Sequence, residues 1–125
     1  MALENDLLDL FKINVVGNVH LFNLYVPLIL KGKVKKVITI SSGLADNDFT
    51  LKMGLANSGP YACSKAAMNV VTAKYSVEYA DQGVCFLNIC PGLVETGHYA
   101  SCTYWLLLTT SFYWRALSFA TFPYT

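Results

Sequence analysis

Tyr61 and Lys65 are the two residues whose types and spacing best suit acid–base chemistry. They are four residues apart, and on a helix residues four apart lie on the same face with adjacent side chains. A phenol is a poor acid or base at neutral pH because its reference pKa is about 10, whereas a neighbouring cation favours the phenolate. Such a pair can pass a proton to or from a hydroxyl or carbonyl group. The same spacing also arises by chance in amphipathic helices, so the pair alone does not establish a function.

Two segments that could bind a ligand follow the two predicted strands. Ser42 comes directly after the apolar segment 35–41, and residues 91–96 come directly after the apolar segment 84–90. Ligands of open parallel sheets bind in the crevice beyond the carboxyl ends of the strands. We therefore expect Ser42 and residues 91–96 to face one crevice, beside the start of the helix that carries the Tyr–Lys pair.

Asn14 is a polar residue in a largely apolar stretch of the first predicted helix. A mid-helix Asn without a capping role indicates a local irregularity or a specific polar partner. An Asn that faces solvent is the alternative, and the residue taken alone does not decide between them.

Hydrophobic periodicity predicts one long helix over residues 3–30 and a second helix from Pro60 to about Ala80. We expect the first helix to be interrupted near Pro27 and to end by Gly32, and Pro60 to occupy the first turn of the second helix. The apolar stripes expected to face the core are Leu7, Leu8, Phe11, Val15, Val19, Phe22 and Val26 in the first helix and Ala62, Ala66, Val70, Ala73 and Val77 in the second.

Two short apolar segments, 35–41 and 84–90, are rich in β-branched or other apolar residues and predict buried parallel strands. The stretch 42–59 between the first strand and the second helix is mostly polar and is predicted as a long loop. Its turn residues would be Asp46, Asn47 and Asp48. The order helix, strand, helix, strand predicts an α/β fold with a parallel sheet.

Composition excludes several classes of protein. A net charge of +1 with nine Lys or Arg residues argues against a nucleic-acid-binding face. The two long uncharged runs, 13–30 and 96–114, contain too many polar residues to make good membrane spans. The four Cys residues and the two His residues lack metal-ligand spacing, so no metal site is predicted. The acidic start is unlike a signal peptide, and we expect a cytoplasmic protein with reduced thiols.

Taken together, these residues resemble the short-chain dehydrogenase/reductase family, and its fungal members especially. The matching text is Ile-Ser-Ser-Gly-Leu-Ala-Asp at 40–46, Pro-Tyr-Ala-Cys-Ser-Lys-Ala-Ala at 60–67 and Cys-Pro-Gly-Leu-Val-Glu-Thr-Gly at 90–97, with Asn14 upstream. The resemblance covers about residues 5–98. It implies a partial Rossmann-like fold, a doubly wound parallel α/β sheet, and an NAD(P)-dependent oxidoreductase that acts on a carbonyl or alcohol group of a small molecule.

The resemblance also implies a role for each matching residue. Tyr61 would donate or accept the proton, and Lys65 would favour its phenolate form and hydrogen-bond the nicotinamide ribose, so that both contact the cofactor. Ser42 would hold the substrate oxygen, and Asn14 would steady a water in the proton relay. The residues expected to line the nicotinamide are Pro91, Gly92, Val94 and Thr96.

Part of the family pattern has no counterpart in this sequence. Family members begin with a strand and a Gly-rich turn that binds the dinucleotide phosphates, and residues 1–125 hold no such turn. We therefore expect residues 1–98 to be the catalytic C-terminal part of the domain, lacking the N-terminal dinucleotide-binding half and inactive alone. Residues 99–125 carry nine of the 17 aromatic residues and one charge, Arg115, and are expected to form an atypical tail.

Three functional hypotheses remain open at this stage. The first is an incomplete oxidoreductase that uses NAD or NADP, since the residue that would distinguish the two cofactors is missing. The second is a non-catalytic module that pairs through its two long helices with a copy of itself or with a full-length relative. The third is a protein that touches a membrane surface through its aromatic tail.

Overall fold

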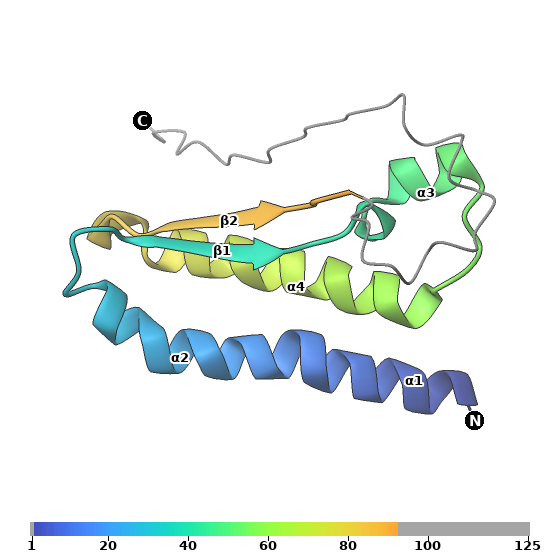
Figure 1. The fold of residues 1–125 in the computed structure, drawn as a ribbon, viewed down its shortest axis with the longest axis horizontal. Helices are drawn as coiled ribbons and strands as arrows, with labels where there is room; N and C mark the ends of the chain where they lie inside the picture. The colour runs from blue at the N-terminus through green and yellow to red at the C-terminus, as the bar shows by residue number, and fades with distance from the viewer. Residues whose placement is uncertain (1, 93–125) are drawn as a thin grey trace.

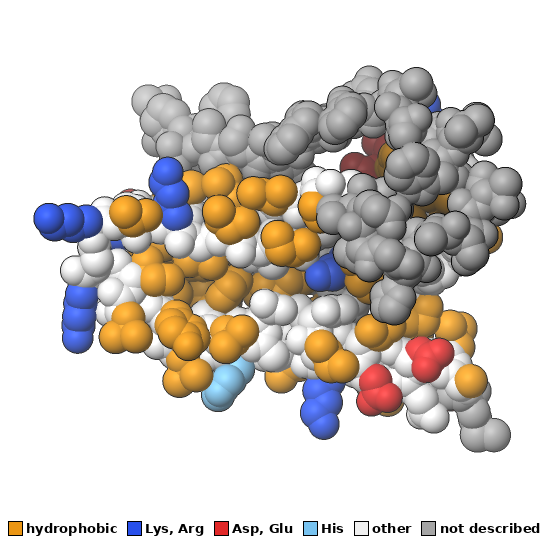
Figure 2. Space-filling view, viewed as in Figure 1, with side chains coloured by type: hydrophobic (Ala, Val, Ile, Leu, Met, Phe, Trp, Pro, Cys, Tyr) orange, Lys and Arg blue, Asp and Glu red, His pale blue; other side chains and the backbone are white. Residues whose placement is uncertain are grey.

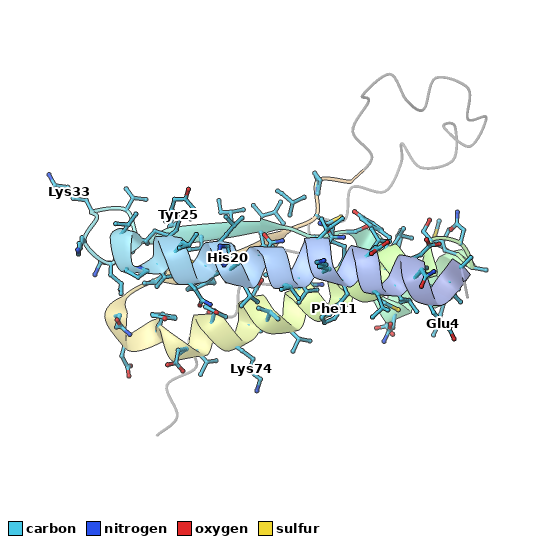
Figure 3. The ribbon with its side chains drawn as sticks, turned by 90° about the horizontal axis from the view of Figure 1, so that it is seen from below. Glu4, Phe11, His20, Tyr25, Lys33 and Lys74 are labelled. Carbon is cyan, nitrogen blue, oxygen red and sulfur yellow. The ribbon has the colours of Figure 1, made fainter. Side chains whose placement is uncertain are left out.

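The computed structural model describes residues 2–92 of the 125-residue chain. Figure 1 shows two long helical segments on one side of a small sheet, and Figure 3, viewed from below, shows them side by side in front of the strands. The elements in chain order are α1 (Ala2–Phe11), the π-helical segment η1 (Lys12–Val16), α2 (Gly17–Ile29), β1 (Lys36–Ile40), the 3-10 segment η2 (Gly43–Ala45), α3 (Asn47–Met53), α4 (Gly59–Glu78), the 3-10 segment η3 (Ala80–Gln82) and β2 (Cys85–Ile89).

The first long helix is continuous from α1 through η1 to α2, as the periodicity predicts. The predicted interruption near Pro27 is wrong, because Pro27 lies inside α2 and the helix continues to Ile29. Proline removes a single helical hydrogen bond, and α2 ends only two residues later. The irregularity lies instead at η1, where Asn14 is part of a π-helical turn. The helix buries Val15, Phe22 and Val26 of the predicted stripe, whereas Leu8 and Phe11 are exposed.

The sheet consists of β1 and β2, which pair in parallel with Lys36 opposite Cys85 and Ile40 opposite Ile89. This pairing confirms the prediction of a parallel α/β arrangement. The prediction that both strands are buried is wrong for one face: Thr39 is 6% exposed, whereas Ile38 and Ile40 are each 54% exposed. The reason is that both long helices pack on the same side of the sheet (Figure 1).

The side of α4 that faces the core is not the predicted apolar stripe. Val70 and Val77 are 60% and 78% exposed, and the buried residues of α4 are Ser64, Met68 and Thr72. This face is partly polar because β1 presents hydroxyl groups toward it. Thr72 Oγ1 lies 3.3 Å from Thr39 Oγ1 in a hydrogen bond between the helix and the strand. Paired hydroxyl groups can be buried at little net cost, so apolar periodicity alone selects the wrong side of this helix.

Aromatic side chains fill the core near the C-terminal end of α4. The ring of Phe22 makes edge-on contacts with Tyr75 and Phe86, at centroid distances of 5.0 Å and 5.4 Å. Tyr79 stacks on Tyr75 with centroids 6.0 Å apart. Edge-on and stacked pairs of this kind add to the free energy gained from burying their area. These contacts hold α2, α4 and β2 together at this end of the molecule.

The stretch 42–59 is not the long loop that its polarity predicts. Residues 47–53 form α3, because the carboxylate of Asp46 accepts a hydrogen bond from Phe49 N–H at 2.9 Å and caps the helix start. Gly54, with φ of 62°, ends α3 in the left-handed conformation that glycine adopts most easily. The predicted start of α4 at Pro60 and the predicted break at Gly83 are both confirmed.

Two features of residues 2–92 bear on the class of protein. No helix in this range is both long and apolar enough to cross a membrane. Within the same residues, no group of three or more His, Cys, Asp or Glu side chains is arranged to hold a metal ion.

Candidate functional site

Tyr61 and Lys65 lie in the first two turns of α4, on one face of the helix. The Lys65 ammonium nitrogen is 5.7 Å from the centroid of the Tyr61 ring. It also donates a hydrogen bond of 2.9 Å to the carbonyl oxygen of Ile40, the last residue of β1. The ammonium group is therefore held between the phenol ring and the carboxyl end of a strand. A lysine ammonium has three N–H donors, and this bond uses one of them.

Ser42 lies two residues beyond the carbonyl group that Lys65 holds. Its backbone is extended, and its Oγ accepts a hydrogen bond from Leu44 N–H at 3.2 Å, which starts the short segment η2. Because this bond uses the hydroxyl oxygen as an acceptor, the O–H of Ser42 can still donate. η2 packs against α4, so the turn that begins at Ser42 lies beside the helix of Tyr61 and Lys65.

Asn14 is joined to this site through a side chain that the sequence analysis missed. Asn14 Nδ2 donates to Ser64 Oγ at 3.0 Å, and Ser64 Oγ donates to the carbonyl oxygen of Tyr61 at 2.8 Å. Asn14 therefore has both features that its position indicates, a π-helical irregularity and a polar partner, and the solvent-facing alternative is wrong. Asn18 Nδ2 adds a 2.8 Å bond to the carbonyl oxygen of Asn14.

Ser64 is the residue that sequence reasoning should have singled out. It is 1% exposed, and a Ser inside a helix commonly bonds a carbonyl one turn earlier. The sequence alone therefore suggests the bond from Ser64 to a backbone carbonyl. It does not reveal the second partner, Asn14, which is 50 residues away. Asn69 is a similar case, since its Oδ1 accepts a 2.7 Å bond from Ser41 Oγ and ties α4 to the residue after β1.

The ends of the two strands meet at one place, as expected for a parallel sheet. In Figure 1 both arrowheads point toward the region where α3 and the start of α4 lie. A Cβ atom built on Gly43, just after β1, would lie 3.9 Å from Cys90 Sγ, just after β2. Pro91 and Gly92 follow at the same end and are exposed, and Gly92 has φ of 73°. Val94 and Thr96 lie outside the described residues.

A shallow hollow of about 320 Å³ lies at the opposite end of α4, lined by Lys74, Tyr75, Glu78 and Tyr79. It shares no residue with the Tyr61–Lys65 pair. Because the chemistry-bearing side chains and the strand ends meet at the start of α4, that end is the candidate site.

Comparisons with known proteins point to one family. The family model for short chain dehydrogenases matches residues 2–106. A short chain dehydrogenase of Hypocrea virens, virK, is 54% identical over 101 residues, which are 81% of this chain and 37% of that protein. A short-chain dehydrogenase/reductase of Pestalotiopsis fici, iacC, is 54% identical over 97 residues, 78% of this chain and 36% of that protein. An uncharacterized oxidoreductase of Schizosaccharomyces pombe, C663.09c, is 36% identical over 86 residues.

The chain spans about a third of the length of these relatives, 33–37% in the three cases. No solved structure gives a significant match.

Proposed function

The chain belongs to the short-chain dehydrogenase family, and from this premise we propose that it carries the proton-transfer part of an NAD(P)-dependent oxidoreductase. The substrate would be a small molecule with a carbonyl or alcohol group. The observation that carries the proposal is the placement of Lys65, whose ammonium group lies between the Tyr61 ring and the carboxyl end of β1. A phenol and a cation at the strand ends are what proton transfer to a bound substrate requires.

Tyr61 would exchange a proton with the substrate oxygen. Lys65 would place a positive charge beside the phenol ring, and its bond to the carbonyl oxygen of Ile40 fixes where that charge is. Ser42, whose O–H remains able to donate, would hydrogen-bond the same substrate oxygen and hold it near the Tyr61 hydroxyl. These three residues would orient the substrate and supply its proton.

When bound, NAD or NADP would supply the hydride. The donors at the strand ends fit the ribose end of such a cofactor, because Lys65 keeps two N–H groups beyond its bond to Ile40. Residues proposed to contact the nicotinamide end are Tyr61, Lys65, Pro91, Gly92, Val94 and Thr96.

Asn14 would support this site from the first helix. Its side-chain amide is held by Ser64, which also bonds the backbone of Tyr61, so a water near η1 would have a fixed polar neighbour.

On this proposal, residues 1–98 are the catalytic part of the domain and residues 99–125 an additional tail. We propose a cytoplasmic location, as expected from the sequence.

The test joins residues 1–98 to the N-terminal segment of the Hypocrea virens relative and measures carbonyl reduction with NADPH and NADH. Tyr61→Phe should lose most of the turnover, because the phenylalanine ring has no proton to give. Tyr25→Phe on α2, where the side chain is 55% exposed, is the matched control and should keep it. Full activity of Tyr61→Phe would refute the proton-transfer role.

Cofactor binding by the unmodified chain is a separate test. Because residues 1–125 contain no Gly-rich turn for the phosphates, we expect only weak binding when NADPH or NADH is titrated and its fluorescence followed. Tight, saturable binding would contradict that expectation.

A second candidate function, a pairing module, is favoured by the outer side of the first helix. Leu21, Leu24 and Leu28 of α2 are 47%, 55% and 60% exposed, and Figure 3 shows that surface toward the viewer, with His20 labelled on it. A run of exposed apolar side chains of this kind marks interaction surfaces. The module would pair with a second copy or with a full-length relative.

Co-expression with the Hypocrea virens relative followed by size-exclusion chromatography tests this pairing. A mixed complex should form and should be lost in Leu24→Lys, whereas Lys33→Ala, in the exposed turn after α2, should leave it intact. Elution of separate species with the unmodified chain would contradict the pairing function.

A further inference from the structure

The turn between α2 and β1 is basic and exposed. Residues 31–36 read Lys-Gly-Lys-Val-Lys-Lys, so this basic turn holds four of the nine Lys or Arg residues of the chain. Every residue of the turn except Lys35 is exposed. Lys35 Nζ donates a hydrogen bond of 3.1 Å to the carbonyl oxygen of Gln82 in η3, which ties the basic turn to the segment before β2. Figure 3 shows Lys33 projecting from this end of the molecule.

The opposite end of the molecule is acidic. Five of the eight Asp or Glu residues lie in α1 or at the start of α3, namely Glu4, Asp6, Asp9, Asp46 and Asp48. In Figure 1 the start of α1 and α3 lie at the right, and the basic turn lies at the left. Figure 2 shows Lys side chains at the left end and acidic side chains toward the right end. The molecule is therefore electrically polarised along its long axis, although the net charge of the chain is only +1.

Two carboxylates near the basic turn reduce its charge without cancelling it. Glu78 is the last residue of α4, and Asp81 lies in η3, next to the residue that Lys35 bonds. Four ammonium groups against two carboxylates leave an excess of positive charge at this end. An anionic partner is therefore attracted to the basic turn and repelled by the acidic end of the molecule.

The basic turn also exposes apolar surface, which indicates the kind of anionic partner. Val34, between Lys33 and Lys35, is 73% exposed. Leu28, in the last turn of α2, is exposed as well. At the surface of a bilayer, lysines can reach lipid phosphates while neighbouring apolar side chains enter the boundary of the acyl chains. A nucleic-acid backbone would pair with the lysines and leave Val34 in water, so the combination favours lipid.

We propose that the basic turn is a docking site for an anionic lipid surface. The orientation follows from the fold, because β1 begins at Lys36 beside the turn and its carboxyl end, where Lys65 bonds Ile40, points away from the turn. The candidate site therefore stays open to water while the turn is bound. This docking uses a different part of the chain from the aromatic tail, and it does not depend on the proposed function.

Co-sedimentation of the full chain with vesicles tests the docking. The chain should bind vesicles of phosphatidylcholine mixed with phosphatidylserine and should not bind vesicles of phosphatidylcholine alone. Raising the salt concentration from about 0.1 M to about 1 M shortens the screening length from about 10 Å to about 3 Å and should release the chain. Inorganic phosphate should release no more of the chain than chloride at the same ionic strength, because the free ion offers no apolar boundary.

Removing two lysines measures the contribution of the basic turn. One lysine near an anionic leaflet changes the binding constant about fivefold, so Lys31→Ala combined with Lys33→Ala should weaken binding to the mixed vesicles about 25-fold. Lys12→Ala combined with Lys52→Ala is the matched control, since both lysines are exposed and lie outside the basic turn. The control pair should change binding less than about twofold. Far-UV circular dichroism checks that each variant is folded.

The apolar part of the docking has its own variant. Val34→Ser should weaken binding to the mixed vesicles and leave the salt dependence unchanged, because it removes apolar area and no charge. Val70→Ser, at an exposed position of α4, is the matched control and should bind like the unmodified chain.

Several results would overturn the proposal. They are no binding to the mixed vesicles, equal binding to phosphatidylcholine alone, and equal weakening by the two lysine pairs. Tighter binding to a duplex DNA fragment than to the mixed vesicles, lost in the Lys31 and Lys33 variant, would assign the basic turn to nucleic acid instead.

Chemical modification of lysines gives a readout that needs no substitution. Mixed vesicles should slow the reaction of Lys31 and Lys33 with an amine reagent, followed by mass spectrometry, and should leave the reaction of Lys12 and Lys52 unchanged. Vesicles of phosphatidylcholine alone should protect none of these four lysines. Equal protection of the two pairs by the mixed vesicles would contradict docking through the basic turn.

Discussion

Replacing Ser64 by alanine tests whether the link between the first helix and the start of α4 is as strong as its geometry implies. Ser64 Oγ accepts from Asn14 Nδ2 at 3.0 Å and donates to the carbonyl oxygen of Tyr61 at 2.8 Å. The side chain is 1% exposed, so water cannot readily take its place. Ser64→Ala removes both bonds with almost no change in volume.

The size of the effect follows from the groups left behind. The Asn14 amide loses its partner in a partly buried site, and an unsatisfied donor of this kind costs about 1–3 kcal/mol. The Tyr61 carbonyl oxygen remains part of the helix backbone, so losing the hydrogen bond from Ser64 costs it little free energy. Alanine is the better helix former by up to about 0.5 kcal/mol, which offsets part of the cost. We therefore expect Ser64→Ala to lower the free energy of unfolding by about 1–2 kcal/mol.

Urea denaturation followed by far-UV circular dichroism measures this difference in the full chain. Cys63→Ala, on the exposed side of the same turn, is the matched control and should change stability by less than about 0.5 kcal/mol. A Ser64→Ala effect no larger than that of the control would refute the reasoning.

A double-mutant cycle with Asn14 separates the link from other effects of the substitution. If the two side chains depend on each other, Asn14→Ala combined with Ser64→Ala should cost less than the sum of the single variants, by about 0.5 kcal/mol or more. Strict additivity would show that the 3.0 Å contact contributes nothing measurable.

Two further predictions follow from the structure. Met68 is 2% exposed, and Met68→Ala should lower the free energy of unfolding, measured by urea denaturation, by about 2–5 kcal/mol. Val70 is 60% exposed, and Val70→Ala should lower it by less than about 0.5 kcal/mol. The reverse order would mean that α4 presents its other side to the core. Gly54→Ala, at φ of 62°, should cost about 1–2 kcal/mol in thermal denaturation. Gly17→Ala, at a helical φ of −59° within the first long helix, should be neutral or stabilising, and equal effects would show that the left-handed turn is not what ends α3.

Local sequence signals were enough to locate most of the elements. The start of α4 at Pro60, its end region at Gly83 and both strands lie within a residue or two of their predicted bounds. These features are local because a proline favours the first turn of a helix and a left-handed glycine favours its end. The short helix α3 was missed because its side chains are mostly polar and its cap, Asp46, resembles a turn residue.

Residue spacing alone was enough to predict that Tyr61 and Lys65 share a helix face and that this face begins beside the end of a strand, because spacing within one helix and strand order need only local information. The surroundings of these two side chains depend on how the chain packs. Packing leaves Val70 exposed and buries Ser64, because the hydroxyl groups of β1 can hydrogen-bond a polar face of α4. It also joined Asn14 to Ser64 across 50 residues and left one sheet face open within residues 2–92. Contacts between distant segments depend on which surfaces meet when the chain packs, and no local pattern specifies that.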